Sequence, residues 1–240
     1  MSCATLEAWQ SVLTPGLQTR AQLRERIADQ PPAPPAALWL LRHGETTMNA
    51  ARLMSGSTDV PLTELGRRQA RDAGLAAAGE PFDIAFASQL QRSRDTLAIM
   101  TAAGRLTVPA AEDARLAERS LGTDELQPRD TRDPLHVADL AHAPDGGESY
   151  LELTARCLSF LLDVRDLAAY LGRPLALLVN THQGPLRMMT AIVDETGDFA
   201  LARGRRIENC VAVRRTLGQV AWPAFIEGIS QTPMGASGLP

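Results

Sequence analysis

The fold is decided by the stretch ALWLLRHGET, residues 37–46, in which five apolar residues run directly into an arginine and a histidine. An apolar run of this length is typical of a strand that is buried on both faces of a sheet. A second run, LALLV at residues 175–179, leads into Asn180, Thr181 and His182. Open α/β sheets carry their sites at the carboxyl ends of strands, so we expect His43 and His182 to lie side by side.

Helices and a short strand are expected between these two runs. Thr63 can cap a helix that reaches about Gly79, and residues 84–87 (IAFA) suit a strand. The following SQLQ, residues 88–91, has the spacing of a capping box led by Ser88, which predicts a helix through Met100.

The second half of the chain continues the same alternation. A second capping box at residues 149–152 predicts a helix with a buried leucine stripe, and residues 209–217 and 219–222 predict a strand pair joined at Gly218. Strands that alternate with helices predict an α/β fold, a three-layer sandwich with a largely parallel central sheet flanked by helices on both faces.

Three regions follow from this pattern. Residues 1–36 are predicted to form an N-terminal helical extension that ends in a proline-rich linker, QPPAPP at residues 30–35. Residues 37–227 form the predicted main domain. Residues 228–240 are small and polar and predict a flexible C-terminal tail.

Composition excludes several classes of function. The 240 residues carry a formal net charge of −4, which argues against nucleic-acid or membrane-surface binding. All 24 basic side chains are arginine, so neither Schiff-base catalysis nor a lysine-containing phosphate-binding loop is available. The three cysteines have no disulfide or zinc spacing, and no secretory leader or membrane span is recognisable, so we expect a cytoplasmic protein.

The cluster RHGETTMN, residues 42–49, resembles the opening motif of the histidine phosphatase superfamily, the phosphoglycerate-mutase-like enzymes. Further blocks of the family pattern follow in order over roughly residues 37 to 222. They are GSTDVPLTELGRRQA (56–70), SQLQRSRDT (88–96), LAERSLG (116–122), GES (147–149) and VNTHQGPLR (179–187). The resemblance implies phosphoryl transfer without a metal or cofactor, and in its phosphatase branch the hydrolysis of a small phosphomonoester.

The resemblance and the chemistry of the residues imply the same roles. His43 would attack phosphorus and form a phosphohistidine, while the forked guanidinium groups of Arg42 and Arg92 bind the phosphate oxygens. His182 would hydrogen-bond the transferring oxygens, and Glu118 would act as general acid and base for the leaving group and for water.

Four further residues are candidates for phosphate binding: Asn49, Thr46, Gly56 and Gln183. Gln183 stands where the family usually has glycine, and it adds an amide beside the predicted pocket. The histidines at positions 136 and 142 are six residues apart, which does not suit a metal pair on one helical face, so we interpret them as loop residues.

Two alternatives to hydrolysis stay open. A mutase would return the phosphoryl group to its substrate instead of to water, and a non-catalytic module would bind phosphate without turnover. The expected partner is a small phosphorylated metabolite of unknown identity, with no nucleic acid and no membrane, and a homodimer is left open.

Overall fold

The computed structural model describes residues 2–14, 16, 18–131, 139–194, 206–221 and 223. Its central sheet has five strands in the order β3-β2-β4-β1-β5. They are β1 (Ala36–Arg42), β2 (Ile84–Ala87), β3 (Ala110–Glu112), β4 (Leu175–Thr181) and β5 (Val213–Leu217). Only β5 runs antiparallel to its neighbour, so the sheet is mostly parallel, and the predicted fold class is confirmed.

The two long apolar runs form the centre of the sheet, β1 beside β4, with Arg42 opposite Thr181 in register. Alternate side chains of β1 enter two separate cores. Leu38 and Leu40 join one apolar cluster, whereas Trp39 and Leu41 join the other. Both faces of the strand are therefore covered, as its unbroken apolar sequence predicts.

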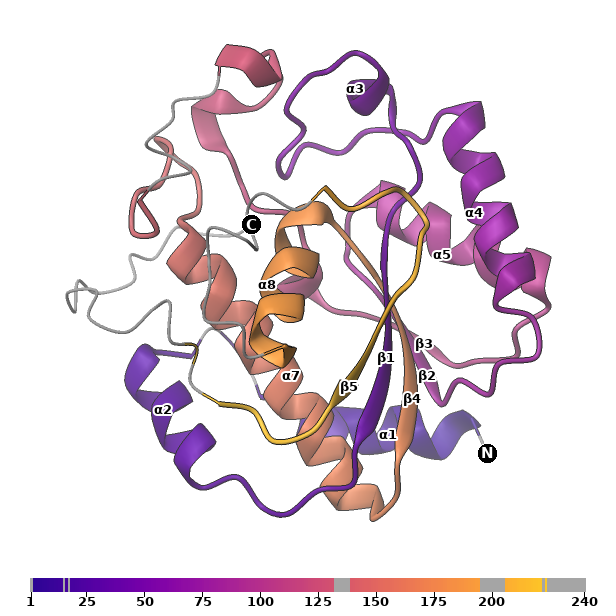
Figure 1. Cartoon of the computed structure of the whole chain (residues 1–240), viewed down its shortest axis with the longest axis vertical. Helices are drawn as coiled ribbons and strands as arrows, with labels where there is room; N and C mark the ends of the chain where they lie inside the picture. The colour runs from indigo at the N-terminus through magenta and orange to yellow at the C-terminus, as the bar shows by residue number, and fades with distance from the viewer. Residues whose placement is uncertain are drawn as a thin grey trace.

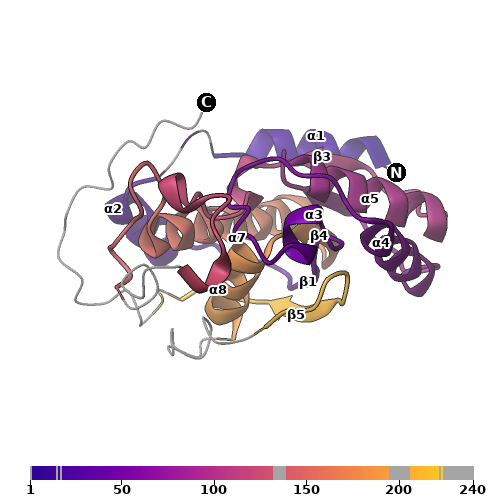
Figure 2. The ribbon, with the colours of Figure 1, turned by 90° about the horizontal axis from the view of Figure 1, so that it is seen from above.

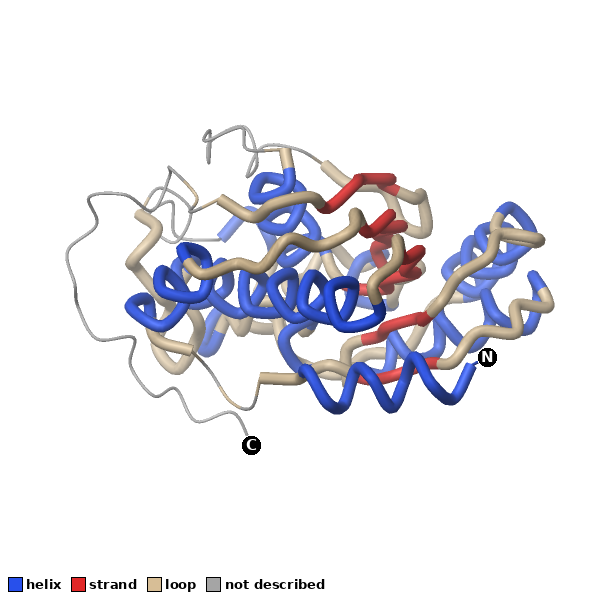
Figure 3. The backbone as a smooth tube through the Cα atoms, turned by 90° about the horizontal axis from the view of Figure 1, so that it is seen from below, coloured by secondary structure: helices blue, strands red, loops and turns tan. Residues whose placement is uncertain are grey.

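Helices cover each face of the sheet (Figures 1 and 2). One side carries α4 (Glu64–Ala76) and α5 (Gln91–Gly104), which pack closely against each other because Gly74 and Gly104 leave no room for a side chain between them. The other side carries α7 (Tyr150–Leu171) and α8 (Gln183–Val193). Three layers result, with the sheet in the middle (Figure 3).

The N-terminal extension contains two helices, α1 (Ser2–Val12) and α2 (Arg20–Ala28). Trp9 of α1 is buried in the main core, with its ring centroid 4.7 Å from Phe86 of β2 and 5.8 Å from Phe160 of α7. Leu23 of α2 is fully buried as well. The two helices therefore pack on the main domain and complete its core.

The three predicted helix caps have different outcomes. Thr63 caps α4, and Ser149 begins α7 in a capping box with Glu152, as expected. The cap predicted at Ser88 is wrong, because α5 begins two residues later, after Leu90, which makes no side-chain cap. Asp59 Oδ1 instead accepts a bond from the Gln91 amide at 2.7 Å, and so supplies an acceptor at the exposed helix end.

The predicted strand pair near the C-terminus is also wrong. Residues 213–217 form β5, but they pair with β1, and residues 219–221 are not in a strand. Asn209 makes only an isolated bridge to Arg42. Residues 213–217 instead supply the last strand of the sheet, because β1 offers them a free edge of backbone N–H and C=O groups. The predicted tail at 228–240 lies outside the described residues.

None of the helices among the described residues is long and apolar enough to cross a membrane.

Candidate active site

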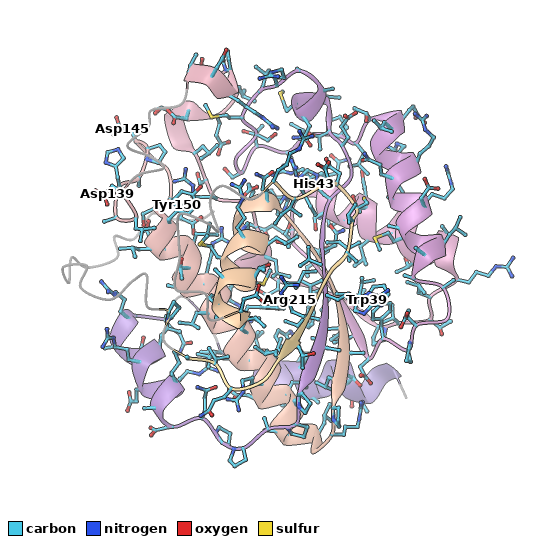
Figure 4. The ribbon with its side chains drawn as sticks, viewed as in Figure 1. Trp39, His43, Asp139, Asp145, Tyr150 and Arg215 are labelled. Carbon is cyan, nitrogen blue, oxygen red and sulfur yellow. The ribbon has the colours of Figure 1, made fainter. Side chains whose placement is uncertain are left out.

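The carboxyl ends of β1 and β4 bring His43 and His182 together. The His43 amide donates to the Thr181 carbonyl at 2.9 Å, which extends the pairing of the strands by one residue. The imidazole ring centroids are 5.0 Å apart and tilted by 54°. The expectation that both histidines lie side by side at one edge of the sheet is therefore met, and Figure 4 shows His43 at this end of β1.

His43 is held in one tautomer. Its Nδ1 lies 2.7 Å from the Gly44 carbonyl oxygen, which can only accept, so Nδ1 carries the proton and Nε2 has a free lone pair. The ring is buried, and burial followed by the positive charges of Arg92 and Arg42 holds the pKa of His43 well below its usual value. The imidazole is neutral at neutral pH.

His182 is fully buried, and both of its ring nitrogens have partners. Arg92 Nε donates to Nδ1 at 3.2 Å, so Nε2 carries the proton and donates to Ser88 Oγ at 2.7 Å. Its pKa is also held well below the usual value, by burial and then by Arg92. His182 is not among the residues that line the pocket. In this structure His182 supports Arg92, and its predicted contact with the transferring oxygens stays a prediction.

The two predicted arginines converge on the same place. Arg92, in the first turn of α5, donates from its two terminal nitrogens to the Thr58 and Gly56 carbonyls at 2.7 and 2.6 Å. Arg42 donates to the Ile207 carbonyl at 3.1 Å, and its buried Nε has no hydrogen-bond partner among the described residues. A buried donor without a partner costs free energy, and an anionic ligand would satisfy it.

These side chains open into a pocket of about 330 Å³. Among the predicted site residues, it is lined by Arg42, His43, Asn49, Gly56, Arg92, Glu118 and Gln183. Thr46 is the exception besides His182: it is fully buried as the N-cap of α3 (Thr47–Ala50) and accepts a bond from the Asn49 amide. It orders the loop that presents Asn49.

Glu118 reaches the pocket from the loop after β3. Its Oε1 accepts bonds from the Arg119 amide at 2.9 Å and the Gly184 amide at 3.0 Å. A Cβ on residue 184 would lie 2.3 Å from this oxygen, so glycine is needed there for the carboxylate to approach α8. The glycine that follows Gln183 is thus used to seat the predicted acid.

Several pocket residues were not predicted from the sequence. Arg119, Arg129, Arg187 and Tyr150 all line the pocket, and the Arg119 guanidinium lies 4.3 Å from the centre of the Tyr150 ring. Figure 4 shows Tyr150 at the start of α7. Arg187 lies one helical turn after Gln183, a spacing that could have indicated it. Arg129 carries no such signal, because its position depends on a long loop.

The pocket is strongly cationic. The pKa of Arg42 is lowered to about 10, mainly by burial, with Glu118 opposing the shift and Arg129 and Arg187 adding to it. Arg42 stays charged at neutral pH, and Glu118 is the one acid among the described residues that line the pocket. Such a site favours a small ligand with several negative charges.

The two histidines outside the site were interpreted from the sequence as loop residues and not as a metal pair. His142 lies in a loop, and position 136 lies outside the described residues. Within the described ranges no group of three or more histidine, cysteine or acidic side chains could hold a metal ion. Cys157 and Cys210 are buried, and burial raises the pKa of each thiol to about 12, so neither is a nucleophile at neutral pH.

A neutral histidine beside several arginines at the carboxyl edge of the sheet suits the binding and transfer of a phosphoryl group. Residues 38–218 match the model of the histidine phosphatase superfamily (branch 1). The chain belongs to this superfamily, whose members are phosphoryl-transfer enzymes.

Named relatives include both mutases and phosphatases. The chain is 34% identical over 191 residues to 2,3-bisphosphoglycerate-dependent phosphoglycerate mutase 2 of Gloeobacter violaceus, covering 74% of this chain and 84% of the relative. Among solved structures it is similar to Bacillus stearothermophilus YhfR, with 27% identity, a TM-score of 0.64 and coverage of 75% and 90%. A mycobacterial glucosyl-3-phosphoglycerate phosphatase, 27% identical, has a TM-score of 0.59 and coverage of 74% and 90%.

Proposed function

We propose that this protein hydrolyses a small phosphomonoester through a phosphohistidine on His43, without a metal, with Glu118 as general acid and base. The observation that carries the proposal is the tautomer of His43. Its Nδ1–H is held by the Gly44 carbonyl oxygen, which leaves the Nε2 lone pair of a neutral imidazole for attack on phosphorus.

The phosphate is bound beside this nitrogen by Arg42 and Arg92, both of which line the pocket with His43. The unpartnered Nε of Arg42 is satisfied by a phosphate oxygen. His182 acts as a positioning residue, since its Nδ1 accepts from Arg92 Nε and so orients that guanidinium. Charge that develops on the transferring oxygens meets fixed cations in a largely buried site.

The reaction then takes two steps. In the first, a bond forms between His43 Nε2 and phosphorus, the bond from phosphorus to the ester oxygen breaks, and the Glu118 carboxylic acid gives its proton to the departing oxygen. In the second, water attacks phosphorus, Glu118 takes a proton from it, and the N–P bond breaks to release phosphate. The Arg119 amide donates to Glu118 Oε1 at 2.9 Å, and the Gly184 amide lies 3.0 Å from Oε1 and 3.4 Å from Oε2, so the two amides orient the carboxyl group.

Turnover of p-nitrophenyl phosphate in EDTA tests this proposal. We expect hydrolysis to continue when divalent metals are chelated and His43→Ala to abolish it, with loss of at least about 10³-fold. Normal turnover by His43→Ala would overturn the assignment of the nucleophile. Binding of orthophosphate with no turnover of any phosphomonoester would instead support a non-catalytic module.

A mutase is the second candidate, and the names of the curated relatives favour it. The two activities differ in the acceptor of the phosphoryl group, which is water in one case and the substrate in the other. The protein is incubated with 3-phosphoglycerate and a trace of 2,3-bisphosphoglycerate while ³¹P NMR follows the products. Inorganic phosphate supports the phosphatase, and 2-phosphoglycerate without phosphate release supports the mutase.

A further inference from the structure

The Glu125 carboxylate binds the loop that contains Gly56, although the two lie far apart in the sequence. Its Oε1 accepts from the Ser57 amide and hydroxyl, each at 2.8 Å, and its Oε2 accepts from the Thr58 amide at 2.9 Å and from the Thr58 hydroxyl. The Leu121 amide adds a bond to Oε1 at 3.0 Å. Five donors therefore converge on one half-buried carboxylate.

Gly56 makes this approach possible. Its φ of +49° is in the left-handed region, and a Cβ there would lie 2.2 Å from Glu125 Oε1. The loop and the carboxylate are consequently fitted to each other, and the conformation of residues 56–58 depends on the acid.

The same loop holds Arg92 by its carbonyl groups. Gly56 and Thr58 accept from the two terminal nitrogens of Arg92, while Nε of the same guanidinium donates to His182. The amides of the loop thus bind Glu125 and its carbonyls bind Arg92. A shift of the loop would rotate the guanidinium plane and break its bond with His182.

We propose that Glu125 is a positioning residue for phosphoryl binding, which acts through residues 56–58 to fix the guanidinium of Arg92. The inference rests on the proposed function for the identity of the ligand, a phosphoryl group. Catalysis is sensitive to displacements of about 1 Å in such groups, so loss of this support weakens the binding of the transferring phosphoryl group.

Glu125 is not a second proton donor. Both oxygens are occupied by donors, and Glu125 does not line the pocket, whereas Glu118 does. Burial raises the pKa of Glu125, but the bonds from Thr58, Ser57 and Leu121 outweigh it, and the pKa is lowered overall. The carboxylate therefore stays ionised, and in this form both of its oxygens can accept hydrogen bonds from backbone amides.

The test compares Glu125→Gln with Glu118→Gln and with Glu112→Gln, a control whose side chain is 54% exposed on β3. In the glutamine variant an NH₂ group meets backbone N–H donors that cannot rotate away. We expect kcat/KM to fall about 10- to 100-fold for p-nitrophenyl phosphate and to the same extent for glycerol phosphate. Inhibition by orthovanadate weakens about tenfold, and the pH profile keeps both limbs.

Glu118→Gln has a different signature if it removes a proton donor, because its loss is larger for glycerol phosphate, a poor leaving group. A Glu125→Gln loss confined to the poor leaving group would overturn the positioning role. Unchanged inhibition by orthovanadate would overturn it as well.

Thr58→Val is the second variant, for the case in which Glu125→Gln does not fold. It removes one donor to Oε2 and keeps the backbone amide. We therefore expect smaller losses of kcat/KM, equal on the two esters, and a smaller weakening of inhibition by orthovanadate. Where both fold, the double variant loses less than the product of the single losses, since the two residues act through one loop. If His43→Ala keeps normal turnover, the proposed function is wrong. If Glu125→Gln leaves inhibition by orthovanadate unchanged, this inference is wrong. The two failures are therefore distinguishable.

Discussion

At the scale of single residues, the site depends on which nitrogen of each histidine carries a proton. His43 donates from Nδ1 to a carbonyl, whereas His182 accepts at Nδ1 from a guanidinium and donates from Nε2. The two rings are therefore in opposite tautomers. Of the two histidines, His43 lines the pocket, and its Nδ1 contact leaves the Nε2 lone pair free.

Long-range ¹H–¹⁵N NMR spectra of the imidazoles test this assignment. We expect a protonated Nδ1 for His43, a protonated Nε2 for His182, and no titration of either ring between pH 8 and 6. Burial and the nearby arginines lower the pKa values of both histidines, so each ring is protonated only well below pH 6.5. A ring that titrates near pH 6.5 would contradict this account.

The role of Glu118 depends on the leaving group. Replacement by glutamine keeps the volume and removes the proton, so we expect kcat to fall about 10²- to 10⁴-fold for an alkyl phosphate. The loss is smaller for p-nitrophenyl phosphate, because its leaving group needs no proton at neutral pH. Steady-state kinetics on both esters measures the difference, and equal losses on the two would argue that Glu118 is not the acid.

Sequence reasoning located these residues but not all of their contacts. His43, Arg92 and His182 were predicted because each lies in a motif at the end of a strand or the start of a helix, and Glu118 because its block resembles the acid-bearing block of the family. The partners of Glu125 were not predictable, since they join residues 57–58 to residue 125 across two loops. Contacts between loops depend on backbone conformations that a single sequence does not reveal.

At the scale of elements, α8 is fitted to the acid that it faces. The amide of Gly184, in the first turn of α8, donates to Glu118, and the missing side chain leaves space for the carboxylate.

The strands differ in how far the sequence predicts them. Strands β1 and β4 were predicted because each is one continuous apolar run. β5 was assigned to the wrong partner because the pairing of an edge strand is set by the whole sheet and not by the nearest turn.

Gly184→Ala tests the fit between α8 and Glu118. Alanine has a higher helix propensity than glycine, so the substitution does not weaken α8. Its Cβ, however, would displace the Glu118 carboxylate. We expect kcat for an alkyl phosphate to fall about tenfold or more. Gly218→Ala is the matched control, since a Cβ there meets nothing within 4 Å, and its kinetics should equal those of the unchanged protein. Equal kinetics for both variants would refute the fit.

At the scale of the whole molecule, the N-terminal extension contributes to the stability of the domain, although it lies outside the residues 38–218 that match the family. Asp163 of α7 is fully buried and joins the extension to the core. It accepts from Thr14, from Arg26 at 2.8 Å and from Arg115 at 2.6 Å. Arg115 lies three residues before Glu118, so the extension also buttresses the segment that carries the acid.

Urea unfolding of Asp163→Asn tests this connection. Removal of one member of a buried ion pair costs about 3–5 kcal/mol, so we expect a large fall in the free energy of unfolding. Asp166→Asn is the control, because Asp166 also pairs with Arg26 but its side chain is 34% exposed. Its loss should be about 1 kcal/mol or less. Similar losses for the two variants would contradict the structural role of Asp163.

The central claim is that His43 Nε2 becomes phosphorylated. The protein is mixed with a phosphomonoester, quenched within milliseconds, digested at high pH and examined by mass spectrometry. We expect a phosphoryl group on residue 43 that survives alkali and is lost in acid, as a phosphoramidate is. A phosphoryl group that survives acid, or one attached to another residue, would contradict the account.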